Sequence, residues 1–435
     1  MVGDILQRLP DDWELRKLSD VSLIIDSLHK TPAYTTIGYP MVRVTDVKGG
    51  FLDLADALRV DEDIFKEFTR RHMPRRGNII FSRVGTYGNA SYVKTNLPFC
   101  LGQNTALIVP RINSRFLHIC LQSSVVRNQI ECSVVGSTQK TISLKSISTL
   151  LIPIPPQPEL EAIAHILGTL DDKIELNRRL NETLEAMARA IFQSWFVDFD
   201  PVRDKAAGRQ PEGMDAATAA LFPDSFQNSP LGKIPKGWRV GNIGDIASNR
   251  RIGVDPSQLE PGTPYIGLEH MPRKSIALFE WGQADGVESN KFRFSEGDIL
   301  FGKLRPYFHK VGVAPLDGVC STDILVILPT KPHYFALTLA QVSSEDLIQY
   351  VEAASTGTKM PRTNWHDITR YEIVIPDENV MKKFDETIRP MTDSIKANIH
   401  ESRTLAAIRD ALLLKLLSGE VRVANKEKFI EEASK

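Results

Sequence analysis

The sequence predicts an α+β protein with two duplicated, strand-rich domains of mixed α/β character. Two long helices separate these domains and pair as an antiparallel coiled coil, which gives the chain approximate two-fold symmetry. Three observations predict this architecture. The 435-residue chain repeats itself, each repeat contains short β-branched runs closed by turns, and each repeat ends in a long helix with a narrow apolar seam.

The repeat is visible as matched stretches of sequence. "LPDDWELRKLSDVS" at 9–22 returns as "IPKGWRVGNIGDIAS" at 234–248, and "ISTLLIPIP" at 147–155 returns as "ITRYEIVIP" at 368–376. Because the offset stays between 220 and 225 residues, the halves are duplicates. The predicted parts are a first domain at 1–156, a long helix at 157–200, a linker at 201–233, a second domain at 234–376, a second long helix at 377–420 and a C-terminal tail at 421–435.

Within each half, "NIIFSRVG" at 78–85 and "DILFGKL" at 298–304 predict buried strands closed by glycines. "IPIPP" at 152–156 and "IVIPD" at 373–377 are extended exits that lead into the long helices. Pro158 is suited to the first turn of its helix.

Each long helix carries one stripe of residues spaced by four and three. This spacing is typical of an a/d seam that meets a single partner helix. Antiparallel pairing sets Asn177 against Ser402 and Asn181 against Asn398, and a buried amide pair fixes the register of a coil. The expected seam comprises Ile174, Asn177, Asn181, Leu184, Ile395, Asn398, Ser402 and Leu405. Two unrelated amphipathic helices, each lying on its own domain, are the alternative.

Gly168 and Pro390 fall beside each other in the repeat alignment, and each is expected to break or kink its helix. The first helix ends in the aromatic residues Trp195, Phe196 and Phe199, which exceed what one coil needs. We expect this aromatic end to dock a partner.

The composition is that of an ordinary globular protein, with a net charge of −1. Residues 1–156 contain 19 basic and 14 acidic residues, whereas 157–200 contain 4 and 9, which indicates different partners for the two parts. The four cysteines and nine histidines are scattered, so we expect no metal site. No run approaches the roughly 18 apolar residues of a membrane span, and the start lacks the order of a signal peptide, so we expect a cytoplasmic protein without membrane contact.

Catalytic motifs are missing from the sequence. It contains no GxxxxGK[ST], no HExxH and no GxSxG, and no GxGxxG follows a strand. "PDEN" at 376–379 resembles a nuclease carboxylate pair only faintly, since acidic residues favour a helix start in any case. A binding protein is therefore favoured over an enzyme, and no catalytic residue is assigned.

The candidate binding residues lie on polar loops that recur in both halves. "SRVGTYG" at 82–88 matches "GKLRPYFHK" at 302–310, and "GSTQKT" at 136–141 matches "GTKMPRTNW" at 357–365. Cations and aromatic rings on such loops suit contacts to phosphates and base edges. The expected DNA-binding residues are Arg43, Arg75, Arg76, Arg83, Tyr87, Ser137, Thr138, Gln139, Lys140, Lys303, Arg305, Tyr307, Lys310, Lys359, Met360 and Arg362. Ordinary solvated turns are the alternative.

The chain resembles the specificity subunits of type I restriction–modification enzymes. The resemblance rests on "IPIPPQPELEAIAHILGTLDDKIELNRRLNETLEAMARAIFQSWFVDFDPV", "SPLGKIPKGW", "GTKMPRTNW" and "IKANIHESRTLAAIRDALLLKLLSGEV", and it covers essentially the whole chain. It implies that 1–156 and 234–376 are target-recognition domains, each reading one half of a bipartite DNA site. The helices would be conserved spacers that set the gap between the halves and dock methyltransferase subunits.

The resemblance further implies a prokaryotic complex on double-stranded DNA. It would contain two methyltransferase (M) subunits, which modify adenine, and restriction–translocase (R) subunits. S-adenosylmethionine, ATP and Mg would belong to those partners, and this chain would hold no cofactor. A nuclease or methyltransferase with a degenerate site, and a scaffold without a DNA role, remain the alternatives.

Overall fold

The computed structural model describes residues 9–134, 140–355 and 360–423. The chain divides into two compact units. Unit 1 consists of residues 1–175 and 404–435, and unit 2 of residues 176–403. Each unit therefore contains one strand-rich domain and a stretch of both long helices. No helix in the described ranges combines the length and apolar character that crossing a bilayer requires.

Unit 1 is built on a four-stranded antiparallel sheet in the order β2-β8-β5-β6. A three-stranded sheet, β4-β3-β7, includes the parallel pair β3 and β7, and β1 pairs with β9. The strands are β1 Glu14–Lys17, β2 Ser22–Asp26, β3 Tyr39–Val42, β4 Leu58–Val60, β5 Ile79–Ser82, β6 Ala90–Tyr92, β7 Cys100–Leu101, β8 Thr105–Pro110 and β9 Leu151–Ile154. All four residues of β5 are buried, as its apolar run predicts.

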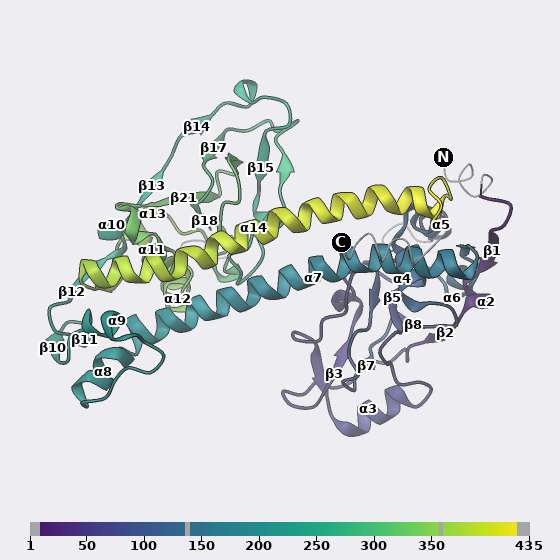
Figure 1. Ribbon diagram of the computed structural model, residues 1–435, viewed down its shortest axis with the longest axis horizontal. Helices are drawn as coiled ribbons and strands as arrows, with labels where there is room; N and C mark the ends of the chain where they lie inside the picture. Colours follow the sequence, from purple (N-terminus) through teal and green to yellow (C-terminus); the bar gives the residue numbers. More distant parts are fainter. Residues whose placement is uncertain (1–8, 135–139, 356–359, 424–435) are drawn as a thin grey trace. The chain divides into compact units, whose positions relative to one another are not determined.

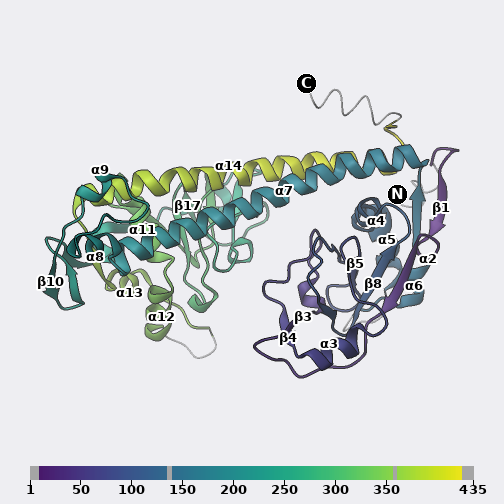
Figure 2. The ribbon, with the colours of Figure 1, turned by 60° about the horizontal axis from the view of Figure 1, so that its bottom comes forward.

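Unit 1 also contains short helices. They are α2 Leu18–Val21, η1 Val44–Asp46, α3 Glu62–Thr69, α4 Ser114–Gln122, α5 Ser124–Ser133 and α6 Leu144–Ser148. Figure 2 shows α4 and α5 beside β5 and β8, and Phe116 and Leu117 of α4 share one core with Ile79, Phe81 and Ile108 of the sheet.

Unit 2 repeats this order, with the sheet β13-β21-β18-β19 in place of β2-β8-β5-β6. Unit 2 also contains a five-stranded sheet in the order β14-β17-β20-β15-β16, and β12 pairs with β22. The strands are β12 Arg239–Asn242, β13 Ala247–Arg250, β14 Gly253–Val254, β15 Pro264–Ile266, β16 Gly282–Gln283, β17 Lys291–Phe294, β18 Ile299–Gly302, β19 Val311–Val313, β20 Gly318–Cys320, β21 Ile324–Pro329 and β22 Glu372–Ile375. Their helices are α10 Ile243–Ile246, η3 Pro256–Gln258, η4 Leu268–His270, η5 Pro306–Phe308, η6 Pro332–Tyr334, α11 Phe335–Val342, α12 Glu345–Ala354 and α13 Trp365–Thr369.

The stretch 201–233, predicted to be a linker, is instead folded onto unit 2. It contains α8 Asp200–Ala206 and α9 Ala216–Ala220, and it runs into the hairpin β10 Phe226–Ser229 and β11 Gly232–Pro235. Val202 and Phe222 are buried in the main core of unit 2. The prediction was wrong because the prolines and small residues of this stretch mask a few apolar anchors.

The long helices are α7 Gln157–Phe192, continued by a π-helical turn η2 Gln193–Val197, and α14 Glu378–Leu417 (Figure 1). In unit 2 they run antiparallel, and Asn398 Nδ2 donates to Asn181 Oδ1 at 2.8 Å. Asn177 Nδ2 lies 3.3 Å from Ser402 Oγ and donates to Glu401 at 2.7 Å. These polar pairs are those that the antiparallel seam alignment predicts.

Both helices are continuous through Gly168 and Pro390, where a break or a kink was expected. α7 passes through Gly168, whose carbonyl accepts a bond from Arg115 Nη2 at 2.8 Å. A Cβ atom at Gly168 would lie 3.3 Å from that guanidinium, so the glycine permits a close approach. α14 passes through Pro390 between the buried Ile388 and Ile395, and this packing offsets a cost of about 3 kcal/mol for an internal proline.

Candidate nucleic-acid interface

Two separate loops of each unit meet through a short backbone bridge. In unit 1 the first loop, residues 82–88, pairs Val84 with Thr141 of the second loop, and Ile142 N donates to Arg83 O at 3.0 Å. In unit 2 the first loop, residues 302–310, pairs Leu304 with Arg362, and Arg305 N donates to Pro361 O at 2.8 Å. In each unit, the first loop therefore meets the described end of the second loop singled out from the sequence.

A third segment, which the sequence reasoning missed, joins this surface in both units. Arg83 N donates to Asn104 O at 2.9 Å, and the corresponding Lys303 N donates to Asp323 O at 2.9 Å. Each segment precedes the matching strand, β8 or β21. "GQN" at 102–104 and "STD" at 321–323 share no residue, so only the strand order reveals their equivalence.

The first loops hold two left-handed backbone positions at matching places. Counted from the flanking strands, Gly85 (φ 71°) and Gly88 (φ 79°) of unit 1 correspond to Arg305 (φ 51°) and His309 (φ 50°) of unit 2. A left-handed conformation costs an L-residue roughly 1–2 kcal/mol, whereas glycine adopts it freely. Unit 2 thus keeps a strained backbone in order to carry side chains there.

Packing inside the fold explains why His309 stands at one of these left-handed positions. His309 is buried, its Nε2 lies 2.9 Å from Ser343 O, and desolvation lowers the pKa of its imidazole. Arg305 is only partly buried, and its Nε has no partner among the described residues. An unbonded buried donor costs about 1–3 kcal/mol, so Arg305 combines backbone strain with an unmet hydrogen bond. Such combinations cluster where ligands bind.

The residues expected to contact DNA in unit 1 differ in their availability. Arg75, Arg76 and Lys140 are exposed. Arg43 bonds Asp46 but keeps a side chain 36% exposed, and Tyr87 donates to Glu131 Oε2 at 2.9 Å.

The structure contradicts the expectation that the side chain of Arg83 faces DNA. Its side chain is 13% exposed, and its guanidinium pairs with Asp26 and donates to Ile142 O at 3.4 Å. Because a buried ion pair satisfies its charge, Arg83 holds the first and second loops together and does not face outward.

In unit 2, Tyr307, Met360 and Arg362 are exposed, and Lys303 is partly buried. Lys310 is the correction here, because its ammonium donates to Leu268 O at 2.5 Å and burial lowers its pKa. Ser137, Thr138, Gln139 and Lys359 lie outside the described residues.

The aromatic end of α7 is not an exposed docking surface. Trp195, Phe196 and Phe199 are 8%, 4% and 8% exposed and belong to the main core of unit 2. The ring centroid of Phe196 lies 4.8 Å from that of Phe384 and 5.8 Å from that of Trp238. The docking prediction was wrong because α14 and the folded 201–233 stretch cover these rings.

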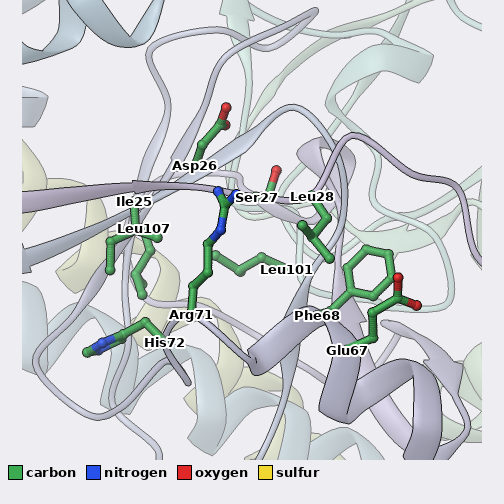
Figure 3. A pocket seen from close by; sticks show the side chains of 10 residues that line it. All are labelled: Ile25, Asp26, Ser27, Leu28, Glu67, Phe68, Arg71, His72, Leu101 and Leu107. Atoms are coloured by element: carbon green, nitrogen blue, oxygen red, sulfur yellow. The ribbon is translucent and has the colours of Figure 1, made fainter.

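Each unit contains a cavity lined by described residues. A cavity of about 20 Å³ in unit 1 has room for about one water. Figure 3 shows the side chains that line it, among them Arg71, Ser27 and Phe68. A cavity of about 390 Å³ in unit 2 has mostly apolar walls and the buried Glu185, whose pKa is raised by desolvation. Glu185 accepts a bond from Ser275 Oγ at 2.7 Å, which ties it to the fold. Asp377, from the "PDEN" stretch, caps a helix by accepting from Asn379 N at 2.8 Å.

Comparison with known proteins gives concordant matches. A family described as type I restriction modification DNA specificity domain matches residues 10–186. The chain is 25% identical to the type I restriction enzyme MjaIX specificity subunit of Methanocaldococcus jannaschii, over 96% of this chain and 95% of that protein. It is 24% identical to the HindI specificity subunit of Haemophilus influenzae, over 80% and 87% of the two chains. The fold is similar to that of the type I restriction–modification S subunit from M. genitalium, with a TM-score of 0.54, 15% identity and coverage of 93% and 96%.

Proposed function

Because the chain belongs to the specificity subunits of type I restriction–modification systems, we propose that each of its units reads one half of a bipartite target in double-stranded DNA. It is a recognition subunit and not the enzyme of its complex. The duplicated loop surface supports two readers of one design. The side chains on the two copies differ, as two different half-sites require.

The observation that carries this proposal is Arg305. Its left-handed backbone stands where unit 1 has a glycine, and its Nε lacks a partner among the described residues. Arginine is the side chain best suited to bidentate contact with guanine O6 and N7. In this proposal Arg305 reads one base pair, whereas the exposed Arg76 of unit 1 contacts the phosphate backbone.

Arg305→Ala is expected to weaken binding to the cognate duplex by about 1–3 kcal/mol and to relax preference at one base pair. Arg76→Ala is the matched control, because loss of a phosphate contact weakens all duplexes alike and reduces the salt slope by about one unit. The measurement is binding of the assembled methyltransferase complex to cognate and single-mismatch duplexes at several salt concentrations. An Arg305→Ala complex that lost affinity equally for every duplex would remove base reading from this loop.

The finer assembly is also part of the proposal. The long helices would set the gap between the half-sites and dock two methyltransferase subunits, to which restriction–translocase subunits are added. S-adenosylmethionine would be bound by the methyltransferase subunits, and ATP and Mg would also be bound by partner subunits and not by this chain. The whole complex would modify adenine, or cut unmodified DNA in the prokaryotic cytoplasm.

The docking surface that we favour is a second apolar stripe on α7 in unit 2. Leu176, Leu180 and Met187 are 58%, 44% and 47% exposed, and their spacing of four and seven puts them on one face. This face lies about 100° around the helix from Asn177 and Asn181, which meet α14. A helix of a methyltransferase subunit would pack against this exposed apolar stripe.

Leu180→Asp combined with Met187→Asp should reduce co-purification of the methyltransferase subunit at least tenfold, because two charges would be buried in the contact. Ala186→Asp adds a charge to the same helix about 100° from Met187 and should leave assembly unchanged. The readout is the ratio of subunits after size-exclusion chromatography, with circular dichroism to verify folding. Normal assembly of the double variant would exclude this stripe as the docking surface.

A further inference from the structure

In the third segment of unit 1, the side-chain amide of Asn104 has no hydrogen-bond partner among the described residues. Asn104 holds a left-handed backbone (φ 66°), and its carbonyl accepts the bond from Arg83 N. Its side chain is partly exposed and makes no hydrogen bond to any described residue. The backbone of Asn104 is thus tied to the first loop while its amide group remains available.

At the equivalent position of unit 2, the side chain makes a contact within the fold. Asp323 occupies the place of Asn104, and its carboxylate lies 3.5 Å from Arg362 Nη2. In unit 1 the residue at the place of Arg362 is Thr141, which has no charge to hold. The bond that engages this side chain in unit 2 therefore has no counterpart between Asn104 and Thr141 in the described part of unit 1.

A cavity of about 180 Å³ borders Asn104. Arg43, Thr45, Gln103 and Tyr34 also line it, and Gln103 Nε2 donates to Thr31 Oγ1 at 3.1 Å. Arg43, singled out from the sequence, and the third segment therefore share one concave surface next to the first loop. Hydrogen-bonding and aromatic side chains around a concavity suit the edge of a base.

We propose that Asn104 is a specificity-determining residue that reads an adenine in the half-site of unit 1, an inference that rests on the proposed function. An amide presents a donor and an acceptor side by side, which match adenine N7 and N6 in the major groove. Arg43 lies on the same surface, and its guanidinium, which pairs with Asp46, would donate from its exposed side to the neighbouring phosphate. The left-handed backbone of Asn104 directs this amide from a position fixed by the first loop.

Backbone conformation alone could explain an asparagine here, because asparagine tolerates the left-handed region. Three variants separate the two roles. Asn104→Gly keeps the backbone and removes the amide, and Asn104→Ala removes the amide and adds strain. Asn104→Asp keeps the size but leaves only acceptors, which match the amino group of cytosine.

The test uses the assembled methyltransferase complex and a set of duplexes in which each base pair of the wild-type motif is changed in turn. Asn104→Gly and Asn104→Ala should lose about 5- to 150-fold of the discrimination at one A·T pair in the half-site of unit 1. Asn104→Asp should shift that preference toward cytosine. Asn96→Ala, an exposed asparagine elsewhere in unit 1, is the matched control and should leave every preference unchanged.

The outcomes distinguish this inference from the proposed function. Unchanged discrimination at all positions in Asn104→Gly and Asn104→Ala, with Arg305→Ala still altering one position, overturns the role of Asn104 and leaves the proposed function intact. Equal loss of affinity for every duplex would make Asn104 a contact without sequence information and would also overturn it. A wild-type complex with no sequence preference would overturn both.

Discussion

Phe196→Ala is expected to destabilise unit 2 by about 3–5 kcal/mol, the usual range for truncating a fully packed phenylalanine. Its ring is 4% exposed and lies in contact with Phe384 of α14 and Trp238 at the start of the second strand-rich domain. One side chain of η2 therefore packs against both α14 and the start of the second strand-rich domain. Truncation leaves a cavity that three elements of the fold border.

Urea unfolding of the full chain, followed by tryptophan fluorescence, measures this effect because Trp195 and Trp238 belong to the same cluster. Leu231→Ala, at a hairpin turn and 44% exposed, is the control and should change stability by less than about 0.5 kcal/mol. If the Phe196→Ala chain had normal stability but failed to bind the proposed methyltransferase partner, the aromatic end would be a docking surface after all.

Glu159→Ala is the second large effect, and it falls on unit 1. The carboxylate is 5% exposed and accepts bonds from Trp13 Nε1 at 3.2 Å and from Val423 N at 3.1 Å. Its removal leaves two buried donors without a partner, at a cost of about 1–3 kcal/mol each. It also removes the partner of Arg422 Nε, which lies 2.9 Å away.

Hydrogen exchange of the full chain should show faster exchange in 160–167, which packs in the core of unit 1, while unit 2 peptides keep their protection. Glu14→Ala, whose side chain is 63% exposed, is the control and should leave both units unchanged. Equal exchange in wild type and Glu159→Ala would show that the carboxylate does not hold the segment after α14.

Local periodicity made the repeat and the helix seam predictable from sequence. Asn177 and Asn181 interrupt an apolar stripe at positions that only a partner helix with matching polar residues could use, and the structure supplies Ser402 and Asn398. The buried strands β5 and β18 were also predictable, from the matched apolar runs at 78–85 and 298–304.

Burial by distant segments defeated other predictions. Nothing near Phe196 in sequence indicates that Phe384, almost 190 positions later, covers it. The third segment escaped notice because Asn104 and Asp323 share a place in the fold but no residue type. Arg83 was assigned to DNA because its loop is polar, and its partner Asp26 lies 57 residues earlier.

The discontinuity of unit 1 has a consequence for synthesis on the ribosome. Residues up to 175 emerge first, but the core also needs Leu416, Leu417 and Val423. At about 5–20 residues per second, roughly 12–50 s pass between the two events. During that interval the apolar face formed by Leu160, Ile163 and Leu167 lacks its C-terminal cover. Nascent unit 1 is therefore an incomplete fold until residues 404–423 emerge, and a ribosome stalled before them would hold a species prone to self-association.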